Sequence, residues 1–181
     1  MTPIFALLIV VVWLYVLRVT RKSELPAWRF IWGSCGLFVL MMVFVRPYCM
    51  QPLAQIVALI AGGFGKLTGM FSAYLIDFEC SGILEIMAFV SLVAFFRAYT
   101  VYERVVVGIL GTFYIIFANA LRIIAICVII YIWGMPSYYV AHTFIGRLIF
   151  YGLSVLLYFF VFTKTQIVRQ KVGGFTYGTD K

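Results

Sequence analysis

Cys80 is set between an acidic stretch and an apolar run, in the segment DFECSGILE. Asp77 and Glu79 precede it, and the small residues Ser81 and Gly82 follow it. A thiol at the start of a helix is favoured as a thiolate, because the helix dipole and the free backbone N–H groups stabilise an anion. The same amides could hold an oxyanion, and small neighbours let a substrate backbone approach. We therefore interpret Cys80 as a candidate nucleophile, with an inert interfacial cysteine as the alternative.

Arg122 is the only charged residue in the apolar run 105–133. A charge inside an apolar span costs at least about 2.5–3.5 kcal/mol on insertion scales, so it indicates a functional site. Asn119 lies about one helical turn earlier on the same face. The alternative is an arginine whose head group snorkels to the interface.

His142 is the only histidine in the chain. A mechanism that needs a proton carrier near neutral pH would use this residue, a carboxylate or the thiol itself. The surrounding segment GMPSYYVAHTFIG is expected to form an outer loop, where His142 alone would be a histidine near the lipid headgroups. A metal site from Cys80, His142 and Glu79 would lack the short-range ligand pair of typical zinc sites, and no cofactor is expected.

The composition indicates an all-α integral membrane protein. Of the 181 residues, 65% are hydrophobic and 11% are charged, whereas soluble domains have about 25% charged residues. The net charge of +8 comes from basic residues beside apolar runs. Membrane topology and anionic lipid explain this pattern, so the bilayer is an expected partner and nucleic acid is not.

Five apolar runs are expected to cross the membrane within one polytopic domain, residues 1–181. They are approximately residues 3–17, 27–45, 82–96, 105–133 and 147–163. The intervening segment 48–80 is interrupted by glycines, and its apolar part is shorter than the about 20 residues that a crossing needs. We expect it to form a re-entrant or interfacial helix and then an extended piece, which protein or water must surround.

The distribution of basic residues favours one long helix over residues 105–133. With one crossing there, 10 of the 14 Lys and Arg residues fall on the cytoplasmic side, as the positive-inside rule requires. The N-terminus is then outside and the C-terminus cytoplasmic, and Cys80, Arg122 and His142 all approach the outer face. A hairpin turning near Asn119, the alternative, would place the basic tail outside. No positive charge precedes the first run, so we expect a retained anchor rather than a signal peptide.

The other three cysteines have structural interpretations. Cys35 and Cys127 lie inside apolar runs and are expected to be small buried hydrophobic residues. Cys49 lies near a span end and could pair with Cys80.

Three short blocks together resemble a known family. CSG at 80–82, NALRI at 119–123 and HTFIG at 142–146 look like the blocks of the exosortase/archaeosortase family, multispanning prokaryotic membrane proteins regarded as cysteine transpeptidases. The resemblance covers about residues 70–150. Because few spans precede the cysteine block, the chain is similar to a compact variant of the family.

The resemblance implies a thiol protease or transpeptidase with a catalytic set of Cys80, Arg122 and His142. Cys80 would attack a peptide carbonyl at the outer face of the prokaryotic cell membrane. Arg122 would hold the oxyanion, and His142 would protonate the leaving amine. The expected partner is a membrane-anchored substrate that ends in a short motif, an apolar helix and a basic tail. Supporting positions would be Asn119, Ser81, Gly82 and Glu79.

A non-enzymatic function is the main alternative. A transporter or an assembly subunit could use Arg122 as a buried functional charge, and Cys80 would then be incidental. A membrane serine protease is disfavoured, because the chain has no GxSxG block.

Overall fold

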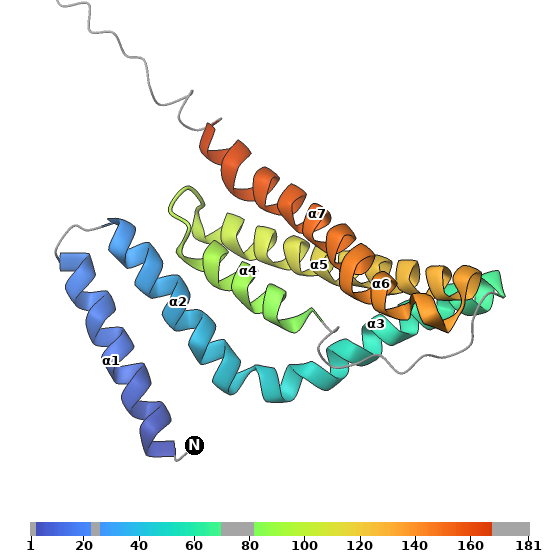
Figure 1. Ribbon diagram of the computed structural model, residues 1–181. Helices are drawn as coiled ribbons and strands as arrows, with labels where there is room; N and C mark the ends of the chain where they lie inside the picture. The colour runs from blue at the N-terminus through green and yellow to red at the C-terminus, as the bar shows by residue number, and fades with distance from the viewer. Residues whose placement is uncertain (1–2, 23–25, 70–81, 168–181) are drawn as a thin grey trace, which may run out of the picture.

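The computed structural model describes residues 3–22, 26–69 and 82–167 (Figure 1). Almost every residue in these ranges is helical, and no strand occurs in them. The longer helices are α1 (Pro3–Lys22), α2 (Pro26–Phe44), α3 (Arg46–Thr68), α4 (Ile83–Phe95), α5 (Val101–Trp133) and α7 (Gly146–Tyr158). The short elements are a 3-10 turn Met135–Ser137, α6 (Tyr138–Val140) and two π-helical segments, Ala141–Ile145 and Phe159–Lys164.

An all-α membrane protein is confirmed by the length and composition of these helices. Four described helices are long and apolar enough to cross a membrane: Ala27–Phe44, Arg46–Thr68, Val101–Trp133 and Met135–Ile167. At 13 residues, α4 is about 20 Å long, shorter than the hydrocarbon core of about 30 Å. The expected set of five crossings remains a prediction.

Helix α5 packs against α3, α4 and α7, whereas α2 packs against α1, α3 and α4. Close approach to α4 depends on Gly111, where an added Cβ would lie 2.1 Å from the ring of Phe89. Small residues commonly allow such approach between membrane helices. Phe89 belongs to a buried cluster with Val93, Ile115, Ala118, Phe150 and Leu157, drawn from α4, α5 and α7.

The region 101–133 is one continuous helix, as the charge distribution predicts. Its start is fixed by a capping box in which Thr100 and Glu103 each bind the other's backbone N–H. Its 33 residues extend about 50 Å. The chain reverses at Gly134, whose φ of 77° suits glycine.

The segment after Gly134 is not the expected loop. Residues 135–167 form a second long helical run that returns along α5. Pro136 lies in the first turn of this run, where a helix needs no N–H from it. His142 is therefore held on a helix rather than in an outer loop.

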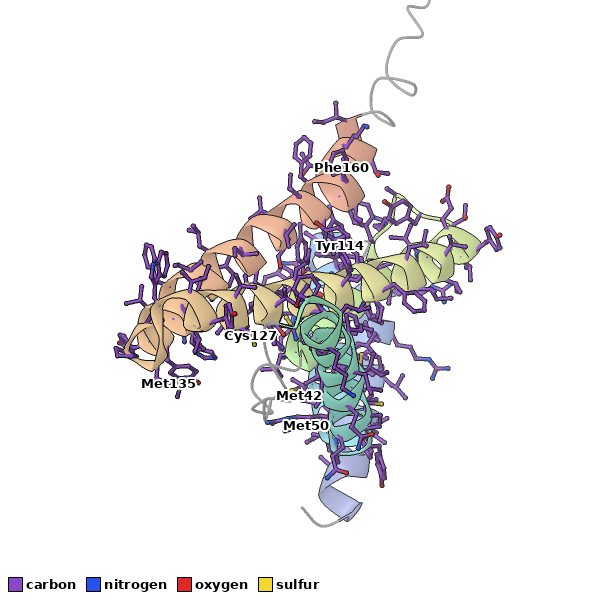
Figure 2. All side chains as sticks on the ribbon, turned by 90° about the vertical axis from the view of Figure 1, so that its right-hand side faces the viewer. Met42, Met50, Tyr114, Cys127, Met135 and Phe160 are labelled. Carbon is purple, nitrogen blue, oxygen red and sulfur yellow. The ribbon has the colours of Figure 1, made fainter. Side chains whose placement is uncertain are left out.

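Residues 46–68 form one continuous helix, α3, so the expectation that glycines interrupt this segment is wrong. Gly62, Gly63 and Gly65 lie inside the helix, and only Gly69, with φ of 66°, ends it. The helix has 23 residues, about 34 Å, so its length permits a crossing. It contacts α5 through a buried cluster of Val57, Ala61, Ala120, Ile123 and Cys127, and Figure 2 shows the two helices meeting near Cys127. The proposed extended piece lies outside the described residues.

Helices α1 and α2 form a neighbouring pair on the α4 side of the molecule (Figure 1). The indole N–H of Trp13 donates to the Trp32 carbonyl at 3.0 Å. Gly33 of α2 lies against Phe95 of α4, where an added Cβ would be 2.3 Å from the ring. The prediction for Cys127 is confirmed because it is buried, whereas Cys35 is exposed, so its expected burial is wrong.

Candidate active site

Gly82, of the block CSG, lies beside Asn119, of the block NALRI. It is buried, has φ of 74° and directly precedes α4. A Cβ added to it would lie 3.4 Å from Cγ of Asn119, whose own side chain is completely buried. Two residues that are 37 apart in sequence are therefore in direct contact at the start of α4. The preceding candidates Cys80, Ser81, Asp77 and Glu79 lie outside the described residues.

Arg122 lies on α5 about one turn after Asn119. Its Cζ is 5.9 Å from the ring centroid of Phe150 on α7. The Phe150 side chain is buried, and Nε of Arg122 is a buried atom. A cation–π contact of this kind is worth about 0.5–2 kcal/mol. The contact is made through the face of the guanidinium, and the planar N–H fork of an arginine is suited to carbonyl or carboxylate oxygens.

His142 lies in the π-helical segment Ala141–Ile145. Its imidazole is half-buried and stacks on Tyr138, with centroids 5.5 Å apart and the rings inclined by 17°. Single π-helical turns in helical runs frequently mark functional sites. The stacking fixes the ring plane and directs its nitrogens away from the Tyr138 face.

The third block meets α5 one turn beyond Arg122. An added Cβ at Gly146 would lie 2.8 Å from Cδ1 of Ile126. Gly146 therefore faces Ile126, and Phe150 faces Arg122, as expected for antiparallel helices. His142 precedes Phe150 by eight residues, about 12 Å of helical rise. The structure thus groups Gly82, Asn119 and Arg122, and places His142 further along the hairpin toward its turn.

Sequence reasoning missed the partners that position Arg122 and His142. Tyr138, His142, Gly146 and Phe150 are each four residues apart, a spacing that places them along one side of a helix. This helical spacing was not recognised, because residues 134–146 were expected to form a loop. The pairing of Phe150 with Arg122 across two helices has no counterpart in the sequence pattern.

A metal site is not formed by the described residues, among which no three His, Cys, Asp or Glu side chains come together. Two members of the alternative metal set, Cys80 and Glu79, lie outside that part of the chain. No protein-family model, curated protein or solved structure matches the chain.

Proposed function

We propose that the chain is a membrane-embedded cysteine transpeptidase or protease in which Cys80 is the nucleophile. The contact between Gly82 and Asn119 is the observation that carries this proposal. Two residues of chain, at most about 7 Å, connect Cys80 to Gly82, and one helical turn separates Asn119 from Arg122. We infer from this chain connectivity that Cys80 and Arg122 act on one substrate peptide.

The proposed reaction proceeds through a thioester. The Cys80 thiolate attacks a peptide carbonyl carbon, and the carbonyl oxygen becomes an oxyanion that the Arg122 N–H groups stabilise. The C–N bond then breaks, the amine leaves with a proton from His142, and the acyl group remains on sulfur. An amine or water next attacks the thioester, gives its proton to His142 and releases the thiolate. The product is a transferred or hydrolysed acyl chain.

His142 and Arg122 must act on atoms of the same scissile bond, although they are offset by about 12 Å along the hairpin. The proposed reaction therefore requires the two side chains to converge on the carbonyl group when a substrate peptide is bound. We infer that His142 serves the leaving amine and the acceptor, while Arg122 serves the acyl part.

The proposed substrate is a membrane protein with a C-terminal motif, an apolar helix and a basic tail. The proposed location of the reaction is the outer face of a prokaryotic cell membrane. In support, Arg104 and Arg122 are 18 residues apart on α5, about 27 Å, close to the about 30 Å of the hydrocarbon core. With Arg104 at the cytoplasmic boundary, Arg122 would be near the outer one.

Cleavage of such a substrate in cells tests the proposal. A protein with this type of C-terminal signal, encoded beside the chain, would be co-expressed with wild-type protein, Cys80→Ala and Cys49→Ala, and the shortened product measured. Cys49 is an exposed cysteine and serves as the matched control. We expect product from wild type and Cys49→Ala and none from Cys80→Ala. Equal product from Cys80→Ala would favour the transporter or assembly-subunit alternative.

A further inference from the structure

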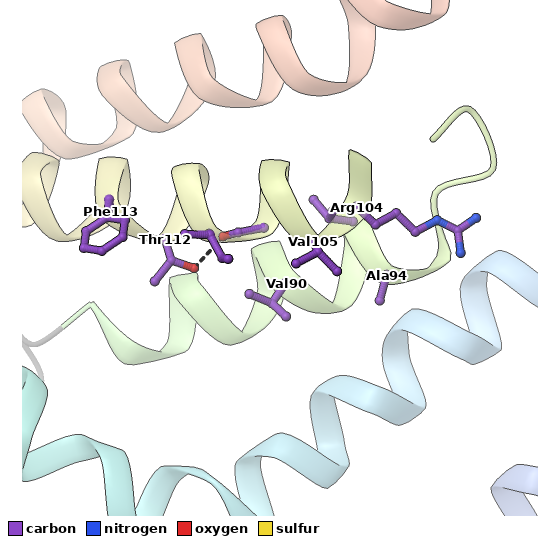
Figure 3. A pocket seen from close by; sticks show the side chains of 9 residues that line it. Val90, Ala94, Arg104, Val105, Thr112 and Phe113 are labelled. Atoms are coloured by element: carbon purple, nitrogen blue, oxygen red, sulfur yellow. Dashed lines mark hydrogen bonds between the residues drawn. The ribbon is translucent and has the colours of Figure 1, made fainter. Parts of the chain in front are cut away.

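An open groove runs between α4 and α5 toward the end of the molecule far from the candidate active site (Figure 3). Its volume is about 420 Å³, and apart from Arg104 at one end its lining is almost entirely apolar. The one hydroxyl in it, on Thr112, donates to the Gly108 carbonyl at 2.8 Å and is therefore satisfied within its own helix. The outer wall is exposed at Val105 and Ile109, so a hydrocarbon chain could enter sideways.

A second hollow, of about 190 Å³, adjoins the charged end of this groove. The two hollows share Ala94 and Arg104, and the second adds Arg29 from α2 and Arg97 from the turn after α4. Figure 3 shows the Arg104 side chain extending beyond Ala94, and Arg104 also lines the second hollow. Three cations from three segments thus line one small space, and no carboxylate is among the described residues that line it.

The convergence of like charges favours the binding of an anion. Neighbouring cations repel each other at short range, and an anion between them converts this repulsion into attraction. Nε of Arg104 is a buried atom that has no hydrogen-bond partner in the described part of the chain. Arginine guanidinium groups are well suited to phosphate oxygens.

We infer that the two hollows together bind one anionic phospholipid, with its phosphate at Arg29, Arg97 and Arg104 and an acyl chain in the groove. Basic pockets between membrane helices are typical binding sites for such headgroups. A helix is about 10 Å wide and one turn of it occupies roughly 400 Å³, so the groove would hold little more than one turn of a peptide helix. A basic substrate tail would be repelled by the arginines.

This lipid site is independent of the proposed catalytic function. Arg104 lies about 27 Å along α5 from Arg122, and no lining residue of either hollow belongs to the candidate active site. Loss of lipid binding and loss of catalysis are therefore separable by mutation.

The test measures lipid that remains bound to the purified protein. Wild-type protein would be incorporated into vesicles of phosphatidylcholine with a minor fraction of phosphatidylglycerol, extracted in detergent, and its bound lipids identified by mass. The Arg97→Gln/Arg104→Gln variant tests the headgroup. Arg147→Gln, at an exposed arginine of α7, is its control.

The acyl chain is tested by filling the groove. Gly108→Leu projects into it, and an added Cβ there meets no atom within 4 Å, so folding should be preserved. Gly152→Leu on α7 has the same open surroundings outside the groove and is the control. Circular dichroism and gel filtration would verify that both variants are folded.

We expect wild type, Arg147→Gln and Gly152→Leu to retain phosphatidylglycerol in preference to phosphatidylcholine. The double arginine variant should lose at least about fivefold of this preference, which is the effect of one basic contact near a lipid surface. Gly108→Leu should retain less phosphatidylglycerol per protein than wild type and Gly152→Leu, because its side chain occupies the groove. Equal retention of both lipids by wild type would overturn the inference. The inference would also be overturned if Arg147→Gln lost as much of the lipid preference as the double variant, because this would show a general charge effect. Full lipid retention by folded Gly108→Leu would overturn it as well.

Discussion

At the scale of single residues, the central feature is an arginine held in place by an aromatic ring. The guanidinium of Arg122 is 5.9 Å from the Phe150 centroid, and Asn119 precedes it on the same helix. Its planar fork of N–H donors is the property that an oxyanion site would use. A lysine at this position would retain the charge and lose the fork.

We predict that Arg122→Lys lowers the rate of acyl-enzyme formation at least about 100-fold, the effect expected for losing an oxyanion donor. The variant should still insert and fold, because the charge and the aliphatic stem are preserved. Arg147→Lys, at an exposed site, should react like wild type. Near wild-type acylation by Arg122→Lys would assign Arg122 a general charge role and favour the non-enzymatic alternative.

Gly82 allows a second prediction with a close control. Gly82 and Gly69 both have positive φ, 74° and 66°, but only Gly82 contacts another side chain, that of Asn119. Alanine at either position should incur the strain of left-handed backbone, about 1–2 kcal/mol. Relief of this strain at Gly82 would shift the backbone two residues from Cys80 and should reduce substrate cleavage at least about tenfold, since small misplacements are costly in catalysis.

Cleavage and thermal stability would be measured together for both glycine variants. Gly69→Ala should lose stability and retain cleavage per folded molecule. If both variants cleave equally well, the contact between Gly82 and Asn119 has no role in the reaction.

Part of the site could be predicted at this scale. Arg122 was identifiable because a charge in an apolar run is costly, and Asn119 because helical spacing places it on the same face. Ile126 was likewise placed on this face by helical spacing. Phe150 could not be identified as a neighbour of the site, because contacts between helices depend on how the helices are positioned. The role of Cys80 stays a prediction.

At the scale of elements, glycines control how closely α5 approaches its neighbours. Gly111 lies under the buried ring of Phe89, whereas Gly108, one turn earlier on α5, has no atom within 4 Å of an added Cβ. The same substitution should therefore have opposite effects at these two positions.

We predict that Gly111→Ala lowers the melting temperature by about 3–10 °C, because overpacking a core costs about 1–3 kcal/mol. Gly108→Ala should leave it unchanged or raise it, since alanine favours a helix by about 1 kcal/mol over glycine. Thermal unfolding in detergent would measure both. An unchanged melting temperature for Gly111→Ala would mean that α4 and α5 are not packed as described.

Which elements could be predicted depended on the kind of signal available. The single helix 101–133 followed from the asymmetry of basic residues, which a hairpin would violate. Residues 134–146 were wrongly predicted to form a loop, because Gly134 and Pro136 are typical turn residues. In the structure, Pro136 lies in the first turn of a helical run. The glycines of α3 were misread as breaks, although helices in apolar surroundings accept glycine.

At the scale of the whole molecule, we propose different roles for the two ends of α5. The hollow lined by Arg29, Arg97 and Arg104 lies near its start, and Asn119 and Arg122 of the candidate active site lie in its second half. The composition was sufficient to predict an all-α membrane protein. It could not predict that residues 46–68 form one helix, because glycines interrupt their apolar pattern.

The orientation of α5 is tested by labelling two exposed tyrosines, Tyr102 near its start and Tyr139 beyond its end. Each would be replaced by cysteine in a chain whose native cysteines are removed. We expect an impermeant thiol reagent to label Tyr139→Cys in intact cells and Tyr102→Cys only after permeabilisation. Labelling of both from outside would contradict a single crossing by α5, and the reverse pattern would contradict the proposed orientation.

The most direct test of the proposed function is isolation of the thioester. Wild-type chain co-expressed with its substrate would be quenched in acid and weighed intact, and the modified residue would be located by peptide mapping. The account predicts an adduct with the mass of the substrate's acyl part, attached to Cys80, removed by hydroxylamine and missing from Cys80→Ala. An adduct on another cysteine, or substrate cleavage that continues in Cys80→Ala without any adduct, would contradict it.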